Sequence, residues 1–134
     1  MIQHIIDQST SILAVLFLFI TFFISVIEKF ADLKGTFTYM TAIFEKTLFA
    51  SVTKILIWVL ICLEIVTLFF LSIGLFELIF EQTKENAIFG SILSTLTILS
   101  MLLGQRVAKD YVGATSLTVY FLASITAIFL LQYK

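Results

Sequence analysis

Four long apolar runs dominate the pattern of hydrophobic and polar positions along the chain. They cover residues 9–27, 55–80, 87–103 and 113–131. A bilayer core about 30 Å thick is crossed by about 20 apolar residues in a helix, and each run meets or nearly meets that length. None of the runs alternates polar and apolar residues as the strands of outer-membrane barrels do. The pattern therefore predicts four membrane-spanning helices.

The first run has the position of a signal peptide but not its flanks. Residues 1–8 contain no Lys or Arg, and no small-residue cleavage site follows the run. A secretory signal usually carries both features. We therefore expect the first run to be a retained span, and residues 1–134 to form a single membrane domain.

The three connections between the runs differ in length. Residues 81–86 and 105–112 are short and polar, which favours antiparallel neighbouring helices. Residues 28–54 are longer, and their apolar side chains recur at helical spacing in Phe37, Met40, Phe44 and Leu48. We expect an amphipathic helix over about 36–50 in the membrane interface, with Gly35 as the break before it. A plain loop with scattered aromatic residues is the alternative.

Small and polar residues recur inside the runs in alternating steps of three and four, which traces one stripe along a helix. In lipid, small residues let helix backbones approach, and hydroxyl groups bond between helices. The four rows are Ala14, Leu18, Thr21, Ser25, Glu28 and Asp32; Leu60, Glu64, Thr67, Leu71 and Gly74; Gly90, Ser94, Thr97, Met101 and Gly104; and Ser116, Tyr120, Ala123 and Ala127. The predicted fold is all-α, an antiparallel four-transmembrane-helix bundle with these rows facing inward.

Composition agrees with a membrane protein and excludes other classes. Of 134 residues, 60% are hydrophobic and 13% are charged, whereas a soluble domain is about 45–50% apolar and about 25% charged. A small domain leaves much of its surface in water and cannot bury this excess. A soluble domain and a disordered chain are therefore excluded, and the net charge of −1 gives no basic field for nucleic acid.

The chain has one cysteine, Cys62, and one histidine, His4. A disulfide, a CxxC redox pair, a Cys/His zinc site and bis-His haem ligation are therefore excluded within one chain. We expect no metal and no cofactor ligated by the chain itself. Cys62 is interpreted as a small apolar filler and His4 as a solvated terminal residue.

Basic residues give an expected orientation. An even number of spans places both termini on one side of the membrane. The first and third connections hold most of the cations, which are Lys29, Lys34, Lys46, Lys54, Arg106 and Lys109, whereas the other side has Lys84 and Lys134. The positive-inside rule then places connections 28–54 and 104–113 in the cytoplasm and both termini outside, in a bacterial cytoplasmic membrane.

Glu64 is the main charged residue inside a run. It lies about nine residues into the second helix, roughly 14 Å along the axis at 1.5 Å per residue. A carboxylate at that depth costs a few kcal/mol, so it needs a partner or a proton. The candidate buried polar site on this side of the bundle comprises Glu64, Glu28, Lys29, Asp32, Arg106, Lys109 and Asp110. Two interpretations stay open: an ion pair that fixes helix register, or a site for a ligand, a proton or a quinone.

Three further side chains are candidates to line a ligand: Thr67, Tyr120 and Trp58. Trp58 also suits an anchor at the membrane interface, where aromatic residues are enriched. Tyr120 suits either a hydroxyl on the inward row or an aromatic wall. We assign no catalytic residue.

The residues resemble those of the DoxX-like membrane proteins in two places. The sequence SVIEKFAD at 25–32 resembles the end of that family's first helix, which commonly closes on Gly/His-x-x-Lys-Phe/Leu, here with Lys29 and Phe30. Glu64 and Gly74 match a Leu-Glu-Ile/Val step about ten residues before a Gly in the family's second helix. Size, four spans and the long first connection also match. Residues 27 and 28 depart from the family's Gly-rich approach to the Lys, and residues 105–114 have no equivalent that can be placed.

The resemblance implies a membrane partner of other proteins. The family is named after a subunit of a thiosulfate:quinone oxidoreductase, and most members have no settled activity. We therefore expect a non-catalytic accessory subunit of a larger membrane complex, in contact with lipid and with other subunits or further copies of itself. The alternative is a quinone- or lipid-binding subunit of an oxidoreductase with Glu64 at the buried site, and a third is a proton-coupled small-molecule transporter. Small multidrug transporters carry their intramembrane Glu in the first helix, where this chain has none before Glu28.

Overall fold

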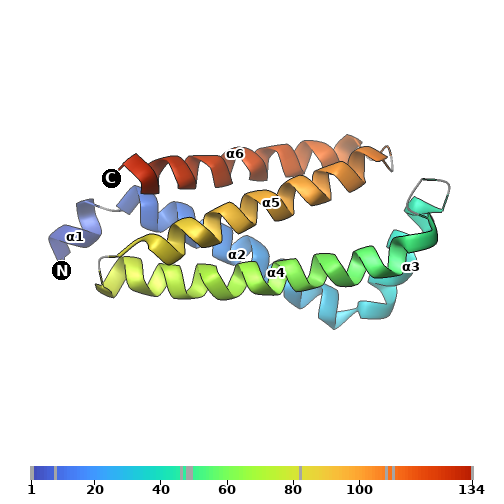
Figure 1. Ribbon diagram of the computed structural model, residues 1–134, viewed down its shortest axis with the longest axis horizontal. Helices are drawn as coiled ribbons and strands as arrows, with labels where there is room; N and C mark the ends of the chain where they lie inside the picture. The colour runs from blue at the N-terminus through green and yellow to red at the C-terminus, as the bar shows by residue number, and fades with distance from the viewer. Residues whose placement is uncertain are drawn as a thin grey trace.

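The computed structural model describes residues 2–7, 9–45, 47, 50–81, 83–107, 109 and 111–133, and within these ranges it contains helices and no strand. The elements in chain order are α1 (Ile2–Asp7), α2 (Ser9–Ala31), α3 (Leu33–Phe44), the 3₁₀ turn η1 (Ala50–Val52), α4 (Thr53–Phe76) with its π-helical continuation η2 (Glu77–Glu81), α5 (Glu85–Val107) and α6 (Tyr111–Tyr133). Figure 1 shows their arrangement. The predicted all-α class is confirmed.

Four of these helices are long and apolar enough to cross a membrane, as the four apolar runs predict. They cover Ser9–Ala31, Thr53–Glu81, Glu85–Val107 and Tyr111–Gln132. Each extends past its apolar run because polar residues complete the turns at its ends, where backbone groups can still be hydrogen-bonded within the helix. This extension matters most in α2, because it places Lys29 on the same continuous helix as the membrane-spanning residues.

The four long helices lie side by side with alternating directions (Figure 1). α5 contacts both α4 and α6, and α2 contacts α4 and α6 on the opposite side. The connection between α5 and α6 lies at the same end as α3, whereas the start of α2 and the end of α6 lie at the other end. The core between them contains Val15, Leu18, Phe22, Leu71 and Ile98, each no more than 1% exposed.

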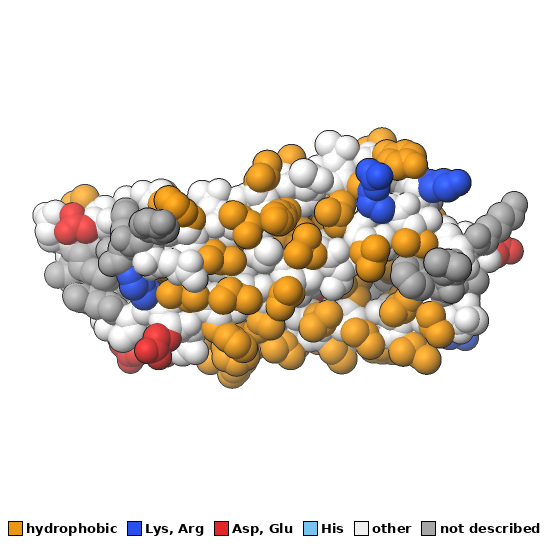
Figure 2. Space-filling view, turned by 45° about the horizontal axis from the view of Figure 1, so that its top comes forward, with side chains coloured by type: hydrophobic (Ala, Val, Ile, Leu, Met, Phe, Trp, Pro, Cys, Tyr) orange, Lys and Arg blue, Asp and Glu red, His pale blue; other side chains and the backbone are white. Residues whose placement is uncertain are grey.

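The outer surface is apolar over the middle of the molecule. Figure 2 shows hydrophobic side chains there and charged side chains toward the two ends of the face in view. Phe69, Leu96, Leu122 and Phe129 are examples of large apolar residues that are more than half exposed. Such continuous apolar exposure is unusual for a protein in water and is suited to acyl chains.

α3 lies at one end of the four long helices and packs on α4 (Figure 1). The rings of Phe37 and Trp58 lie 5.4 Å apart at this contact. The expected break at Gly35 is wrong, because α3 begins at Leu33 and the chain turns at Asp32. The Asp32 carboxylate accepts the N–H of Gly35 at 3.0 Å, which satisfies one of the free donors at a helix start. The helix expected over about 36–50 is shorter in the structure, because α3 ends at Phe44. Leu48 of the expected apolar face lies outside the described residues.

The inward rows of α4 and α5 agree with burial. Glu64, Thr67 and Leu71 are fully buried, as are Ser94 and Thr97. Gly74 lets α4 approach α5 closely, because a Cβ there would lie 2.5 Å from the backbone of Ala87.

The expected row of α6 is wrong in part. Ser116 is exposed, whereas Ala114, Leu117 and Ser124 are buried. Ser124 accepts a hydrogen bond from Thr95 of α5 at 3.0 Å. The buried face of α6 thus includes Ala114, Leu117 and Ser124 together with Ala127, which belongs to the expected row.

Candidate functional site

Glu64 lies in the interior of the helix cluster and has no exposed area. It is on the inward row of α4, and α2 runs beside it. The Nζ atom of Lys29 lies 3.1 Å from Glu64 Oε2 in an ion pair and donates a hydrogen bond of 3.1 Å to Oε1. A buried carboxylate needs such a partner, because lipid cannot solvate it.

Ser25 completes the site from the turn of α2 before Lys29. Its hydroxyl donates to Glu64 Oε1 at 2.9 Å and accepts from Lys29 Nζ at 2.7 Å. Residues four apart share a helix face, so Ser25 and Lys29 reach Glu64 together. Oε2 of Glu64 is buried and receives no hydrogen bond from any described residue. The ion pair therefore leaves one carboxylate oxygen with hydrogen-bonding capacity.

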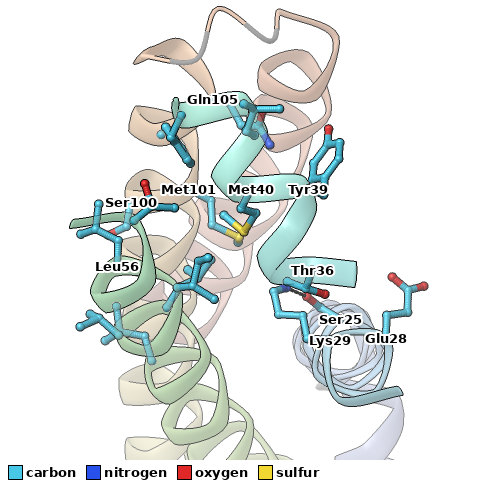
Figure 3. Close-up of a pocket in the computed structure, with 18 of the residues that line it drawn as sticks. Ser25, Glu28, Lys29, Thr36, Tyr39, Met40, Leu56, Ser100, Met101 and Gln105 are labelled. Atoms are coloured by element: carbon cyan, nitrogen blue, oxygen red, sulfur yellow. Dashed lines mark hydrogen bonds between the residues drawn. The ribbon is translucent and has the colours of Figure 1, made fainter. Parts of the chain in front are cut away.

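A cavity of about 730 Å³ lies next to the pair, between α2, α3, α4 and α5. Figure 3 shows Ser25 and Lys29 of α2, Thr36 and Met40 of α3, and Met101 of α5 around this space. Most of the wall is apolar, and α4 supplies much of it through Leu56, Ile57, Val59, Leu60 and Leu63. We call this space the main cavity.

A second cavity of about 320 Å³ lies on the other side of the pair. Its walls come from α2, α5 and α6, with Glu64 contributed by α4. It is lined by Ile20, Thr21, Phe22, Ile24, Ser25, Glu28, Glu64, Ile98, Met101, Leu117 and Tyr120. Lys29 lines only the main cavity and Glu64 lines only the second. The ion pair therefore lies at the boundary between the two.

The charged residues expected to form one cluster do not all meet. Glu28 and Asp32 are exposed and line the main cavity beside Lys29. Arg106 is exposed at the end of α5, where its guanidinium lies 5.3 Å from the ring centre of Tyr111. Lys109 is exposed in the following turn, with a φ of 61°. Neither cation lines a cavity, and Asp110 lies outside the described residues.

The three candidate lining residues also separate. Tyr120 lines the second cavity. Thr67 is buried beside Thr97, with 3.3 Å between the two hydroxyl oxygens, and borders neither cavity. Trp58 is 47% exposed on the outer side of α4 and packs on α3. Cys62 is exposed rather than packed in a core, and the side chain of His4 lies outside the described part of the structure.

Sequence reasoning missed two polar residues of the site. The sequence places Ser25 on the inward row of the first helix, and its position one turn before Lys29 is the signal that links it to the site. Gln105 was overlooked because it is uncharged and lies in a predicted connection. It lines the main cavity, and its Oε1 atom is buried without a hydrogen-bond partner among the described residues.

The part of the chain described by the structure holds no group of three or more His, Cys, Asp or Glu side chains that could bind a metal ion. Comparison of the chain with protein families, with curated proteins and with solved structures gave no match. The geometry of the two cavities and the ion pair therefore carries the functional argument.

Proposed function

We propose that this protein is an antiparallel four-helix transmembrane bundle that binds a quinone or a lipid in the main cavity. The observation that carries the proposal is the main cavity beside the buried Lys29–Glu64 pair. Its volume of about 730 Å³ falls within the range of about 300–1,000 Å³ that ligand pockets occupy. This space suits a headgroup with part of an apolar tail.

The chemistry of the walls favours an amphipathic ligand. Side chains of α4 such as Leu56 and Leu60 form an apolar wall, and Lys29 supplies N–H donors on the side of α2. Gln105 adds an amide whose buried Oε1 atom receives no hydrogen bond from the described residues. Few polar groups in an apolar pocket fix the orientation of a ligand. Lys29 suits the carbonyl of a quinone or the phosphate of a lipid, and the α4 wall suits the tail.

The position of α3 supports entry from the membrane surface. Tyr39 is 57% exposed and also lines the main cavity, and Glu28 and Asp32 lie at the same rim. In this proposal α3 lies in the membrane interface with connections 28–54 and 104–113 in the cytoplasm. A ligand headgroup at interface depth then reaches Lys29 without crossing the apolar core of the bundle.

The biological role we propose is that of a non-catalytic, DoxX-like subunit of a larger membrane complex. The resemblance around Lys29 and Glu64 supports this role, because both residues lie at the pair beside the cavity. The subunit holds the quinone or lipid, and electron transfer belongs to a partner. We propose a bacterial cytoplasmic membrane as its location, with the orientation that the distribution of basic residues predicts.

Binding to the protein in lipid nanodiscs tests the proposal. The probes are a short-chain menaquinone and dioleoylphosphatidylglycerol, with native mass spectrometry and a fluorescence titration as readouts. Leu60→Trp fills the main cavity, and Leu96→Trp places the same side chain on the outer face of α5, where Leu96 is 55% exposed. We expect Leu60→Trp to weaken binding of one probe at least tenfold and Leu96→Trp to leave it unchanged. Equal binding by both folded variants, or no binding by the unaltered protein, would overturn the proposal.

A further inference from the structure

The second cavity is a separate space with its own chemistry. It has a volume of about 320 Å³ and lies mainly between α2, α5 and α6. Thr21, Ile24 and Tyr120 line it and do not line the main cavity. An occupant of this space therefore meets Thr21, Glu64 and Tyr120 in addition to Ser25 and Glu28, which line both cavities.

One polar atom at this cavity, Oε2 of Glu64, has no hydrogen-bond donor among the described residues. The Ser25 hydroxyl already donates to Glu64 Oε1, and the Thr21 hydroxyl donates to the carbonyl oxygen of Phe17 at 2.8 Å. Oε2 of Glu64 is buried and lies 3.1 Å from the Lys29 ammonium, but it receives no hydrogen bond from the described residues. A buried acceptor is less stable when no donor reaches it. The Oε2 atom of Glu64 is therefore suited to an O–H group, whereas the Tyr120 hydroxyl that lines the same cavity can donate or accept.

The outer wall of the second cavity faces the acyl chains in a spanning bundle. Ile20 and Ile24 of α2 line the cavity and are 51% and 48% exposed. Glu64 lies on the inner side with no exposed area. A molecule that comes from the bilayer between α2 and α6 thus meets apolar side chains first and the carboxylate last.

We infer that the second cavity binds the hydroxyl group of a lipid-soluble alcohol, which enters from the bilayer and donates to Glu64 Oε2. The inference goes beyond the proposed function because it concerns another cavity and the opposite hydrogen-bonding role. Two molecular sources share this chemistry: the ring hydroxyl of a quinol and the glycerol hydroxyl of a diacylglycerol. In both, the remainder of the molecule stays among Ile20, Ile24 and the surrounding lipid.

Matched pairs of probes test the hydrogen-bond donor directly. The protein in nanodiscs is titrated with 1,2-dioleoylglycerol and its 3-O-methyl ether, and with a reduced short-chain menaquinol and its dimethyl ether. We expect at least one alcohol to bind at least tenfold more tightly than its ether. Preference in the diacylglycerol pair alone, or in the quinol pair alone, supports the inference and identifies the source. Equal binding of alcohol and ether in both pairs, or no alcohol binding, overturns it.

Two substitutions locate the binding. Thr21→Phe fills the second cavity and leaves the main cavity wall unchanged, whereas Leu60→Trp does the reverse. We expect Thr21→Phe to abolish the preference for the alcohol and Leu60→Trp to preserve it. Ile24→Trp replaces Thr21→Phe if the latter does not give a monodisperse helical protein. Alcohol preference that survives the folded Thr21 or Ile24 variant overturns the inference, and its loss only in Leu60→Trp assigns the alcohol to the main cavity, which also overturns it.

Discussion

Lys29 Nζ lies 3.1 Å from Oε2 of Glu64 and 3.1 Å from Oε1, yet only the contact with Oε1 has hydrogen-bond geometry. The two residues differ in burial, because the Lys29 side chain is 17% exposed and that of Glu64 is not exposed. The ammonium group therefore neutralises the carboxylate from the side of the main cavity. Oε2 of Glu64 is left without a hydrogen-bond donor among the described residues.

A double-substitution cycle measures this pair. We expect Lys29→Gln to destabilise the fold by about 3 kcal/mol, because removal of one partner leaves a buried charge. Glu64→Gln costs less, since the ammonium group can turn toward the main cavity. The double variant is more stable than Lys29→Gln, because both charges are gone. Reversible unfolding in mixed micelles, followed by circular dichroism, gives these free energies.

The control for the cycle is Lys34→Gln. Lys34 is exposed on α3 and lines neither cavity, so its loss should change stability by no more than about 0.5 kcal/mol. Strictly additive effects of the Lys29 and Glu64 substitutions would show that the pair carries no coupling energy, contrary to the structure.

The sequence predicted Glu64 and its need for a partner, but it could not choose that partner. Long apolar runs locate the carboxylate in the span, and alternating steps of three and four place it on an inward row. Lys29, Arg106 and Lys109 all belong to the same end of the bundle. Which cation pairs with Glu64 depends on the rotation of α2 about its axis and on the length of α5. α5 extends to Val107, so Arg106 lies at its exposed end. Periodicity does not determine either quantity.

Gly74 tests the close contact between α4 and α5. A Cβ at Gly74 would lie 2.5 Å from the Cα and the nitrogen of Ala87, so Gly74→Ala forces two backbones apart. We expect a loss of at least about 2 kcal/mol, since neither backbone can yield cheaply. Unfolding in mixed micelles measures it.

Gly104→Ala on α5 is the matched control for Gly74. Its Cβ would lie 3.3 Å from the ring of Phe44, and a side chain can shift by a few tenths of an ångström. We expect a change below about 1 kcal/mol. If Gly104→Ala lowered the free energy of unfolding as much as Gly74→Ala does, the close backbone approach at Gly74 would be contradicted.

Thr95 and Ser124 join α5 to α6 through the hydrogen bond that departs from the expected row of α6. Thr95→Val and Ser124→Ala each remove it, and each should cost about 0.5–1.5 kcal/mol, the range of interhelical hydrogen bonds in membranes. The double variant should cost less than the sum of the two. Thr126→Ala is the control, because Thr126 is exposed and bonds only to the carbonyl of Leu122. A coupling energy near zero would refute the bond.

The rotation of α6 about its axis cannot be deduced from the residue pattern of α6 alone. Ser116, Tyr120, Ala123 and Ala127 form one row at helical spacing, but small residues elsewhere on the same helix form another. The choice between them follows from Thr95, a residue on a different helix. A pattern along one helix carries no information about the hydroxyl that meets it.

Asp32 tests how α3 is held at one end of the four long helices. Its carboxylate caps the N–H of Gly35, and loss of such a cap costs about 0.5–2 kcal/mol of helix stability. We expect Asp32→Ala to speed amide hydrogen exchange in α3 several-fold and to leave α5 unchanged. Asp32→Asn keeps a capping oxygen and should behave like the unaltered protein. Equal exchange in the two variants would contradict the capping role.

Cysteine accessibility tests the orientation of the bundle. On a Cys62→Ala background, Thr83→Cys places one thiol in the connection between η2 and α5, and Lys109→Cys places one in the turn between α5 and α6. Thr83 and Lys109 are exposed and lie at opposite ends of α5. The distribution of basic residues predicts that a membrane-impermeant maleimide labels Thr83→Cys in intact cells and labels Lys109→Cys only after the cells are opened. The reverse pattern would invert the topology, and it would place α3 and the rim of the main cavity on the outer face.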